Sequence, residues 1–157
     1  MLIYALDPGP RSSGFVAYDT EAGAVKSSEK AIENEEALSL ILDLAPFGSQ
    51  VVVAVERVQA QGIAGNDIMR TCEWSARFAQ AALGAGLRLR WHYRREVCRH
   101  LDVSGGGKDA QVRARCIELH GGDRRSAQGV KASPGPLYGV SGHAWQALGL
   151  ALLVADL

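Results

Sequence analysis

Apolar and polar positions along the chain divide it into short segments with strand-like or helix-like spacing. The apolar run at residues 2–6 predicts a buried strand, which ends at Asp7 because the following Pro-Gly-Pro cannot continue a sheet. Two more strands, at 14–19 and 24–28, have the spacing of a β-meander. The β-branched run at 51–55 is typical of a central strand covered on both faces, and it ends at Glu56.

Helical periodicity predicts helices at residues 35–44, 66–83, 95–101, 109–120 and 141–154. The apolar side of the second helix is expected to carry Ile68, Cys72, Ala76, Ala79 and Leu83. Strict alternation at 87–93 predicts an edge strand, and the Gly-, Pro- and Ser-rich segment 123–139 is expected to be a loop. This order predicts an α/β fold, a mixed five-stranded sheet flanked by helices.

The composition adds few constraints. A chain of 157 residues, 47% hydrophobic and 22% charged, suits one globular domain over residues 1–157. No apolar stretch is long enough to span a membrane, and the first residues lack a basic leader and a cleavage site. The three cysteines, Cys72, Cys98 and Cys116, lack metal-type spacing and are interpreted as reduced thiols. We therefore expect a cytoplasmic protein with no membrane partner.

Charge is unevenly distributed, although the net charge is zero. Residues 1–87 carry six Lys and Arg against eleven Asp and Glu, whereas residues 88–131 carry eleven against five. A basic face that meets a polyanion would have this distribution. A set of solvated Arg-rich helices would have it too, and charge alone does not separate the two interpretations.

Two carboxylates stand at the ends of predicted strands. If the strands that end at Asp7 and Glu56 are neighbours, both carboxylates emerge at one sheet edge, where a divalent cation would offset their repulsion. His143 and Gln146 are three residues apart on one helix face and are the best source of further ligands. The alternatives are a turn residue before proline for Asp7 and an ion pair with Arg57 for Glu56. Finding both carboxylates at strand ends favours the metal site.

Residues 3–15 resemble the opening of the RuvC-type Holliday junction resolvases of the RNase H-like superfamily, where the first strand ends in Asp-Pro-Gly. Residues 51–57 resemble that family's central strand, which ends in a catalytic glutamate. Residues 108–113 resemble the start of a later helix, and 135–148 resemble the terminal helix of phage-encoded relatives. Asp-Pro-Gly alone is a weak signal, because sugar kinases and actin-like ATPases share it. The ordered set covers almost the whole chain.

The resemblance implies an RNase H-like fold, a homodimer and incision of four-way DNA junctions at symmetric positions with Mg²⁺ or Mn²⁺. Two metals roughly 3.5–4 Å apart would activate water and stabilise the leaving 3′-oxygen. By the match, Asp7 would bridge both metals, Glu56 would hold one, and His143 would stand where these enzymes place an acidic or histidine ligand. Lys108 would hold the scissile phosphate; without the resemblance, it is equally well explained as a solvated lysine at a helix start.

Gln146 departs from the family pattern, which commonly has a second carboxylate at this position of the terminal helix. The amide leaves about two negative charges among Asp7, Glu56, His143 and Gln146, so metals should bind less tightly than in an all-acidic site. An imidazole ligand also suits Mn²⁺ better than Mg²⁺. A Mn²⁺-preferring enzyme and a weakened relative are both consistent with this set. Asp109 would add a carboxylate if its helix packs near the site.

Candidate DNA contacts follow from the basic residues and from the loop after Glu56. They are Arg11, Arg57, Gln59, Gln61, Arg88, Arg90, Arg94, Arg124, Arg125 and Lys131. In RuvC-like enzymes the loop after the catalytic glutamate enters the junction centre, so Gln59 and Gln61 are expected to make polar contacts there. A lid with no specific contact is the alternative.

Three functions compete. The first is an active resolvase, which we rank above the others. The second is another RNase H-like nuclease that acts on RNA or on other branched DNA, and the third is a junction-binding protein that has lost catalysis. An actin-like ATPase is disfavoured because the chain is too short for two such domains.

Overall fold

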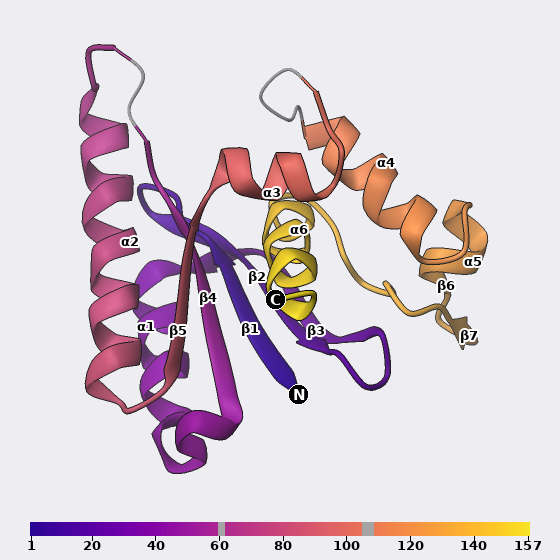
Figure 1. Ribbon diagram of the computed structural model, residues 1–157, viewed down its shortest axis with the longest axis horizontal. Helices are drawn as coiled ribbons and strands as arrows, with labels where there is room; N and C mark the ends of the chain where they lie inside the picture. Colours follow the sequence, from indigo (N-terminus) through magenta and orange to yellow (C-terminus); the bar gives the residue numbers. More distant parts are fainter. Residues whose placement is uncertain (60–61, 105–108) are drawn as a thin grey trace.

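The computed structural model describes residues 1–59, 62–104 and 109–157. A five-stranded sheet lies at its centre, with strands in the order β3-β2-β1-β4-β5 (Figure 1). These strands are β1 (Leu2–Asp7), β2 (Ser12–Asp19), β3 (Ala24–Glu33), β4 (Val51–Arg57) and β5 (Arg88–Tyr93). β2 runs antiparallel to β1 and β3, whereas β4 runs parallel to β1 and β5. The mixed five-stranded sheet predicted from the sequence is confirmed.

The helices are α1 (Asn34–Asp43), α2 (Asn66–Gly84), α3 (Arg94–His100), α4 (Asp109–Leu119), α5 (Arg124–Gln128) and α6 (Ala144–Ala155), with a 3₁₀ segment, η1 (Ala45–Gln50). A short hairpin of β6 (Gly129–Val130) and β7 (Ser133–Pro134) follows α5. No helix among residues 1–59, 62–104 and 109–157 has the length and apolar character needed to cross a membrane.

Helices cover both faces of the sheet and enclose two apolar cores (Figure 1). On one face, side chains such as Leu6 and Val53 pack against α1 and α2, where Phe78 is fully buried. On the other face, Ile3 and Val52 pack against α3, α4 and α6. Burial of each such side chain contributes roughly 1.5–3 kcal/mol, so the alternating apolar positions of β1 and β4 stabilise both layers.

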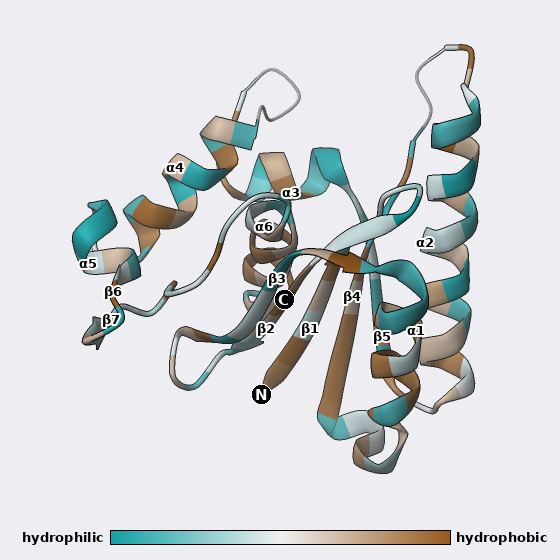
Figure 2. Cartoon of the chain, turned by 180° about the vertical axis from the view of Figure 1, so that it is seen from behind, coloured by the Kyte–Doolittle hydropathy of each residue, from teal (hydrophilic) through white to brown (hydrophobic). Residues whose placement is uncertain are grey.

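The terminal helix α6 is buried on all sides from Ala144 to Val154 and lies against β1 and β2. Figure 2 shows its apolar colouring beside the apolar central strands. A helix that is apolar all round belongs in a core. Gln146 is the only side chain of α6 that carries an amide, and it is only 2% exposed. The polar group at that position is therefore held inside the protein.

The last helix begins at Ala144 and not at residue 141, because Gly142 has a left-handed backbone conformation (φ 52°). Three further local predictions are wrong in part. Segment 123–139 is not only a loop, because Asp123 accepts hydrogen bonds from the backbone N–H groups of Arg125 and Ser126 and so caps α5. The third strand extends to Glu33, five residues beyond the predicted end, because its pairing with β2 continues past two irregularities in register. The third prediction that is wrong in part is the buried side of α2.

Helix α2 buries a different side from the one predicted. The buried residues are Ser75, Phe78, Ala79 and Ala82, whereas Ile68, Ala76 and Leu83 are exposed. Ala79 is the only member of the predicted side that is buried. The large Phe78 turns the helix toward the sheet, and the polar Ser75 is accepted in the core because it has hydrogen-bond partners there.

Candidate active site

Asp7 and Glu56 lie side by side on neighbouring parallel strands. The register pairs Leu6 with Val55, so each carboxylate follows directly at the carboxyl end of its strand. Side chains alternate across a sheet, and Ala5 and Ala54 face the α6 side, so Asp7 and Glu56 face that side as well. Asp7 and Glu56 are therefore neighbours at one edge of the sheet, as the predicted metal site requires.

Glu56 is held in a nearly dry position. Its side chain is 13% exposed, and among the described residues no group donates a hydrogen bond to its buried Oε2. Burial first, and the negative charge of Asp7 second, raise the pKa of Glu56 to about 8. The guanidinium of Arg94 opposes this shift from 3.7 Å (Nη1 to Oε2). Among the described residues, Glu56 is ion-paired with Arg94 and not with Arg57.

His143 approaches Asp7 from the residue before α6. Its Nδ1 lies 3.6 Å from Asp7 Oδ2, and the side chain is 68% exposed. The contact with the Asp7 carboxylate is the main cause that raises the pKa of His143 above its usual value, and the charge of Asp109 adds to the effect. The approach depends on Gly14, since a Cβ there would stand 2.4 Å from the carbonyl oxygen of His143.

Gln146 points to a carboxylate on another helix. Its Nε2 donates a hydrogen bond to Asp109 Oδ1 over 2.8 Å. Arg94 donates to the same oxygen through Nη2 over 3.1 Å, while its Nη1 faces Glu56. Arg94 therefore bridges two carboxylates that belong to β4 and α4.

These side chains surround a cavity of about 420 Å³ that is lined by Asp7, Pro8, Gly9, Pro10, Ser12, Thr71, Arg94, Asp109, His143 and Gln146. A neighbouring cavity of about 320 Å³ reaches Glu56 and also contains Pro8, Thr71 and Arg94. Because Asp7 and Glu56 line adjoining cavities, small molecules or ions can reach both carboxylates from one side of the sheet.

The donor set fits a divalent cation, although the cation ligands are not fully assembled. Within the described part of the chain, no three His, Cys, Asp or Glu side chains form a metal-binding group. Arg94 occupies the position between Glu56 and Asp109. The buried Glu56 Oε2 without a hydrogen-bond donor and the adjacent Asp7 charge are nevertheless the environment that a hard cation with oxygen ligands stabilises.

Two polar residues that the sequence argument did not identify hold the strand ends in place. Asn34 donates to the carbonyl of Gly9 over 2.9 Å and accepts from the buried hydroxyl of Ser13 over 2.6 Å. Ser75 donates to the carbonyl of Glu56 over 2.8 Å. Asn34 lies just before the predicted helix at 35–44 and Ser75 lies within the one at 66–83, and only the folded structure places them beside the strand ends.

The candidate DNA contacts do not all lie near this site. Gln59 and Arg57 line the cavity that reaches Glu56, and Arg57 stacks on Trp91 and Tyr93 with its Cζ 4.5 and 4.9 Å from the ring centroids. Arg11 is exposed in the turn that follows Asp7. Arg94 lies inside the site itself. Lys108 and Gln61 fall outside the described residues.

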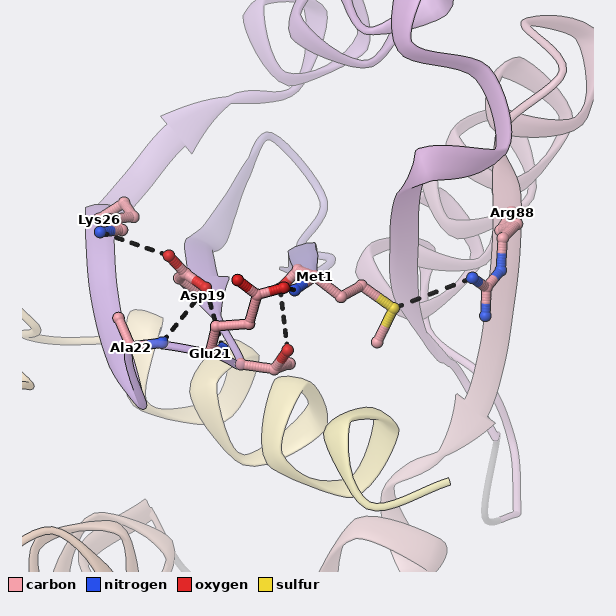
Figure 3. Close-up of polar contacts among 7 residues, drawn as sticks. Met1, Asp19, Glu21, Ala22, Lys26 and Arg88 are labelled. Atoms are coloured by element: carbon pink, nitrogen blue, oxygen red, sulfur yellow. Dashed lines mark hydrogen bonds and ion pairs between the residues drawn. The ribbon is translucent and has the colours of Figure 1, made fainter.

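The remaining basic candidates are more dispersed. Arg88 lies at the opposite end of the sheet, where its Nη1 is 3.9 Å from Met1 Sδ (Figure 3). Arg90 follows on the same edge strand and bonds to the carbonyl of Leu89. Arg124 lines a cavity of about 420 Å³ together with His143 and Asp109, whereas Arg125 and Lys131 are exposed near the β6–β7 hairpin.

The strand order and the helices on both faces define an RNase H-like fold of the RuvC type. No family model and no curated protein sequence matches the chain. Among solved structures, the chain is similar to RuvC of Thermus thermophilus, with 20% identity and a TM-score of 0.62 over 98% of this chain and 92% of that one. It is also similar to T. thermophilus RuvC in complex with a Holliday junction substrate (19% identity, TM-score 0.61, 98% and 91% covered). These likenesses show the fold.

Proposed function

We propose that this chain is a metal-dependent endonuclease that resolves four-way or other branched DNA junctions by paired phosphodiester incisions. The observation that carries the proposal is the pair Asp7 and Glu56 on adjacent parallel strands, where Glu56 keeps a buried oxygen with no hydrogen-bond donor among the described residues. The fold shared with a RuvC that was solved with a Holliday junction supports the choice of substrate.

Mg²⁺ or Mn²⁺, when bound, would supply an activated water and stabilise the leaving 3′-oxygen of the cut strand. Asp7 and Glu56 would hold the ions, and His143 would join them from the start of α6. The imidazole favours Mn²⁺ over Mg²⁺. Burial of Glu56 limits competition by water, and Lys108, by the resemblance, would contact the scissile phosphate.

A basic groove beside the site supports DNA as the partner. A second cavity, which is also lined by His143 and Asp109 but does not contain Asp7, extends to Arg113 and Arg124. Arg113 lies over the ring of Trp145, with its Cζ 5.7 Å from the centroid. A phosphate backbone that follows this cavity would be held by guanidinium groups and led directly to the carboxylates.

Association into a homodimer is part of the proposal, because two symmetric incisions need two active sites. Helix α2 leaves Met69, Ala76 and Leu83 exposed at a spacing of seven residues, which places them on one side of the helix. An apolar side of this kind suits contact with a second copy. Sedimentation equilibrium of the purified protein tests this: a monomer at all concentrations would contradict the proposed dimer.

The central test is cleavage of a labelled four-way junction with Mg²⁺ or Mn²⁺. Wild-type protein is expected to give paired symmetric nicks, and Asp7→Asn is expected to lose them. Asp43→Asn is the matched control, because Asp43 is an exposed carboxylate at the end of α1. Preferential cleavage of an RNA–DNA hybrid would favour the second hypothesis. Tight junction binding without nicks in either metal would favour the third, which the neutral Gln146 keeps open.

A further inference from the structure

The site contains a third carboxylate, that of Asp109, in addition to the proposed ligands Asp7, Glu56 and His143. Asp109 is the first residue of α4, and its side chain is 73% exposed. It lines the same cavity as Asp7 and His143. Its Oδ1 accepts a hydrogen bond from Arg94, which also faces Glu56. Asp109 therefore belongs to this charge cluster and not to the outer surface alone.

The buried amide of Gln146 is oriented toward this carboxylate. With 2% of its surface exposed, Gln146 is fixed by α6, and it donates to Asp109 Oδ1 over 2.8 Å. An amide donor and a carboxylate acceptor suit each other, whereas a second carboxylate at position 146 would repel Asp109. Gln146 is neutral, and its hydrogen bond holds the negatively charged Asp109 beside the cavity.

Arg94 places a positive charge between two carboxylates of the site. Its guanidinium contacts Glu56 Oε2 at 3.7 Å and Asp109 Oδ1 at 3.1 Å, so it neutralises carboxylates from two elements at once. The long contact with Glu56 leaves the buried Oε2 without a hydrogen bond from the described residues. A divalent cation would satisfy that oxygen better than the distant guanidinium does.

We propose that Asp109 is the third carboxylate of the cation site and that Gln146 is its positioning residue. This inference rests on the proposed function, since it assumes that Asp7 and Glu56 hold the cation. It accounts for a neutral amide at position 146: the negative charge near that position comes from α4.

The experiment measures Mn²⁺ binding to the full chain without DNA, by calorimetry and by electron paramagnetic resonance of free Mn²⁺. Asp109→Asn keeps an acceptor for Gln146 but removes the charge, and it is expected to weaken Mn²⁺ binding about tenfold. Glu118→Gln removes a carboxylate from the other end of α4 and should bind Mn²⁺ as the wild type does. Thermal melts verify that both variants fold.

An exchange of the two side chains sharpens the test. Asp109→Asn combined with Gln146→Asp returns one carboxylate to the pair, and it is expected to recover most of the Mn²⁺ affinity. Gln146→Met keeps the volume but removes the donor, so it should weaken Mn²⁺ binding by up to about tenfold, and by no more than Asp109→Asn does, if the orientation of Asp109 matters.

The outcomes separate the two proposals. If Asp7→Asn abolishes Mn²⁺ binding while Asp109→Asn matches the wild type, the role of Asp109 is wrong and the proposed nuclease site stands. If the exchanged variant binds Mn²⁺ as weakly as Asp109→Asn does, a carboxylate at position 146 does not replace the one at position 109, and the inference fails. If the wild type binds no Mn²⁺, both proposals are overturned.

Discussion

The candidate site has two halves that differ in how firmly the fold holds them. Asp7 and Glu56 extend from adjacent central strands, and hydrogen bonds from Asn34 and Ser75 fix the backbone on either side of the pair. His143 and Asp109 stand at the starts of α6 and α4, and both side chains are mostly exposed. The sheet half provides carboxylates in fixed positions, and the helix half provides ligands that can adjust to a cation and to a DNA strand.

The largest expected effect is a loss of junction cleavage, and its size should differ between the two halves of the site. Glu56→Gln should reduce junction cleavage by about 10²–10³-fold, because it removes a preorganised charge from a dry position. His143→Asn should cost less, because its exposed position can be occupied by water. Single-turnover cleavage rates at saturating Mn²⁺ measure both. Equal losses would contradict the distinction between a fixed and an adjustable half.

The second effect is a pH dependence that comes from the sheet half. In the metal-free protein the pKa of Glu56 is about 8, so at lower pH a cation must displace a proton. Mn²⁺ affinity should therefore rise by up to about tenfold per pH unit below pH 8 and level off above it. Calorimetry in buffers of different ionisation enthalpy measures the released proton. Glu56→Gln should remove the part of this proton release that titrates near pH 8.

The same shift predicts how stability without metal changes with pH. The folded protein keeps a proton on Glu56 that the unfolded chain releases near pH 4.5. Stability should therefore fall as pH rises from about 4.5 to about 8, and Glu56→Gln should reduce that fall. Thermal melts across this range, with Asp43→Asn as a control, measure the difference. A wild type and Glu56→Gln with parallel pH profiles would contradict the assignment.

The third effect tests how the two halves are joined. Gly14→Ala would place a methyl group against the backbone of His143, which should destabilise the fold by about 1–3 kcal/mol and displace the start of α6. Gly84→Ala is the matched control, because nothing lies within 4 Å of a Cβ there. Denaturant melts and cleavage rates of the two variants should diverge; two equally stable variants would contradict the close approach.

The smallest effect concerns DNA contacts near and far from the site. Arg124→Gln should reduce the salt dependence of junction binding by about one counterion, because Arg124 lines the cavity beside His143. Arg88 lies at the far end of the sheet beside Met1. Arg88→Gln should therefore leave the salt dependence of junction binding unchanged. Binding titrations over a range of salt concentrations measure both slopes. A reversed order would move the DNA path to the opposite end of the sheet.

Local patterns in the sequence determined the sheet and the sheet half of the site. The strand at 51–55 and the one that ends at Asp7 were predictable because alternation and β-branched runs act over a few neighbouring residues. Apolar residues all round α6 likewise follow from its own sequence. Asp7 and Glu56 therefore emerged as candidates before any tertiary contact was known.

Only the tertiary structure decided the partners of those residues. Asp109 and Gln146 are 37 positions apart, and Arg94 lies on a third element, so no periodicity connects them. The buried side of α2 was mispredicted for the same reason, since packing of Phe78 against the sheet determines it. Backbone patterns depend on near neighbours, whereas side-chain partners and pKa shifts depend on which distant segments meet, and that information arises only when the layers pack.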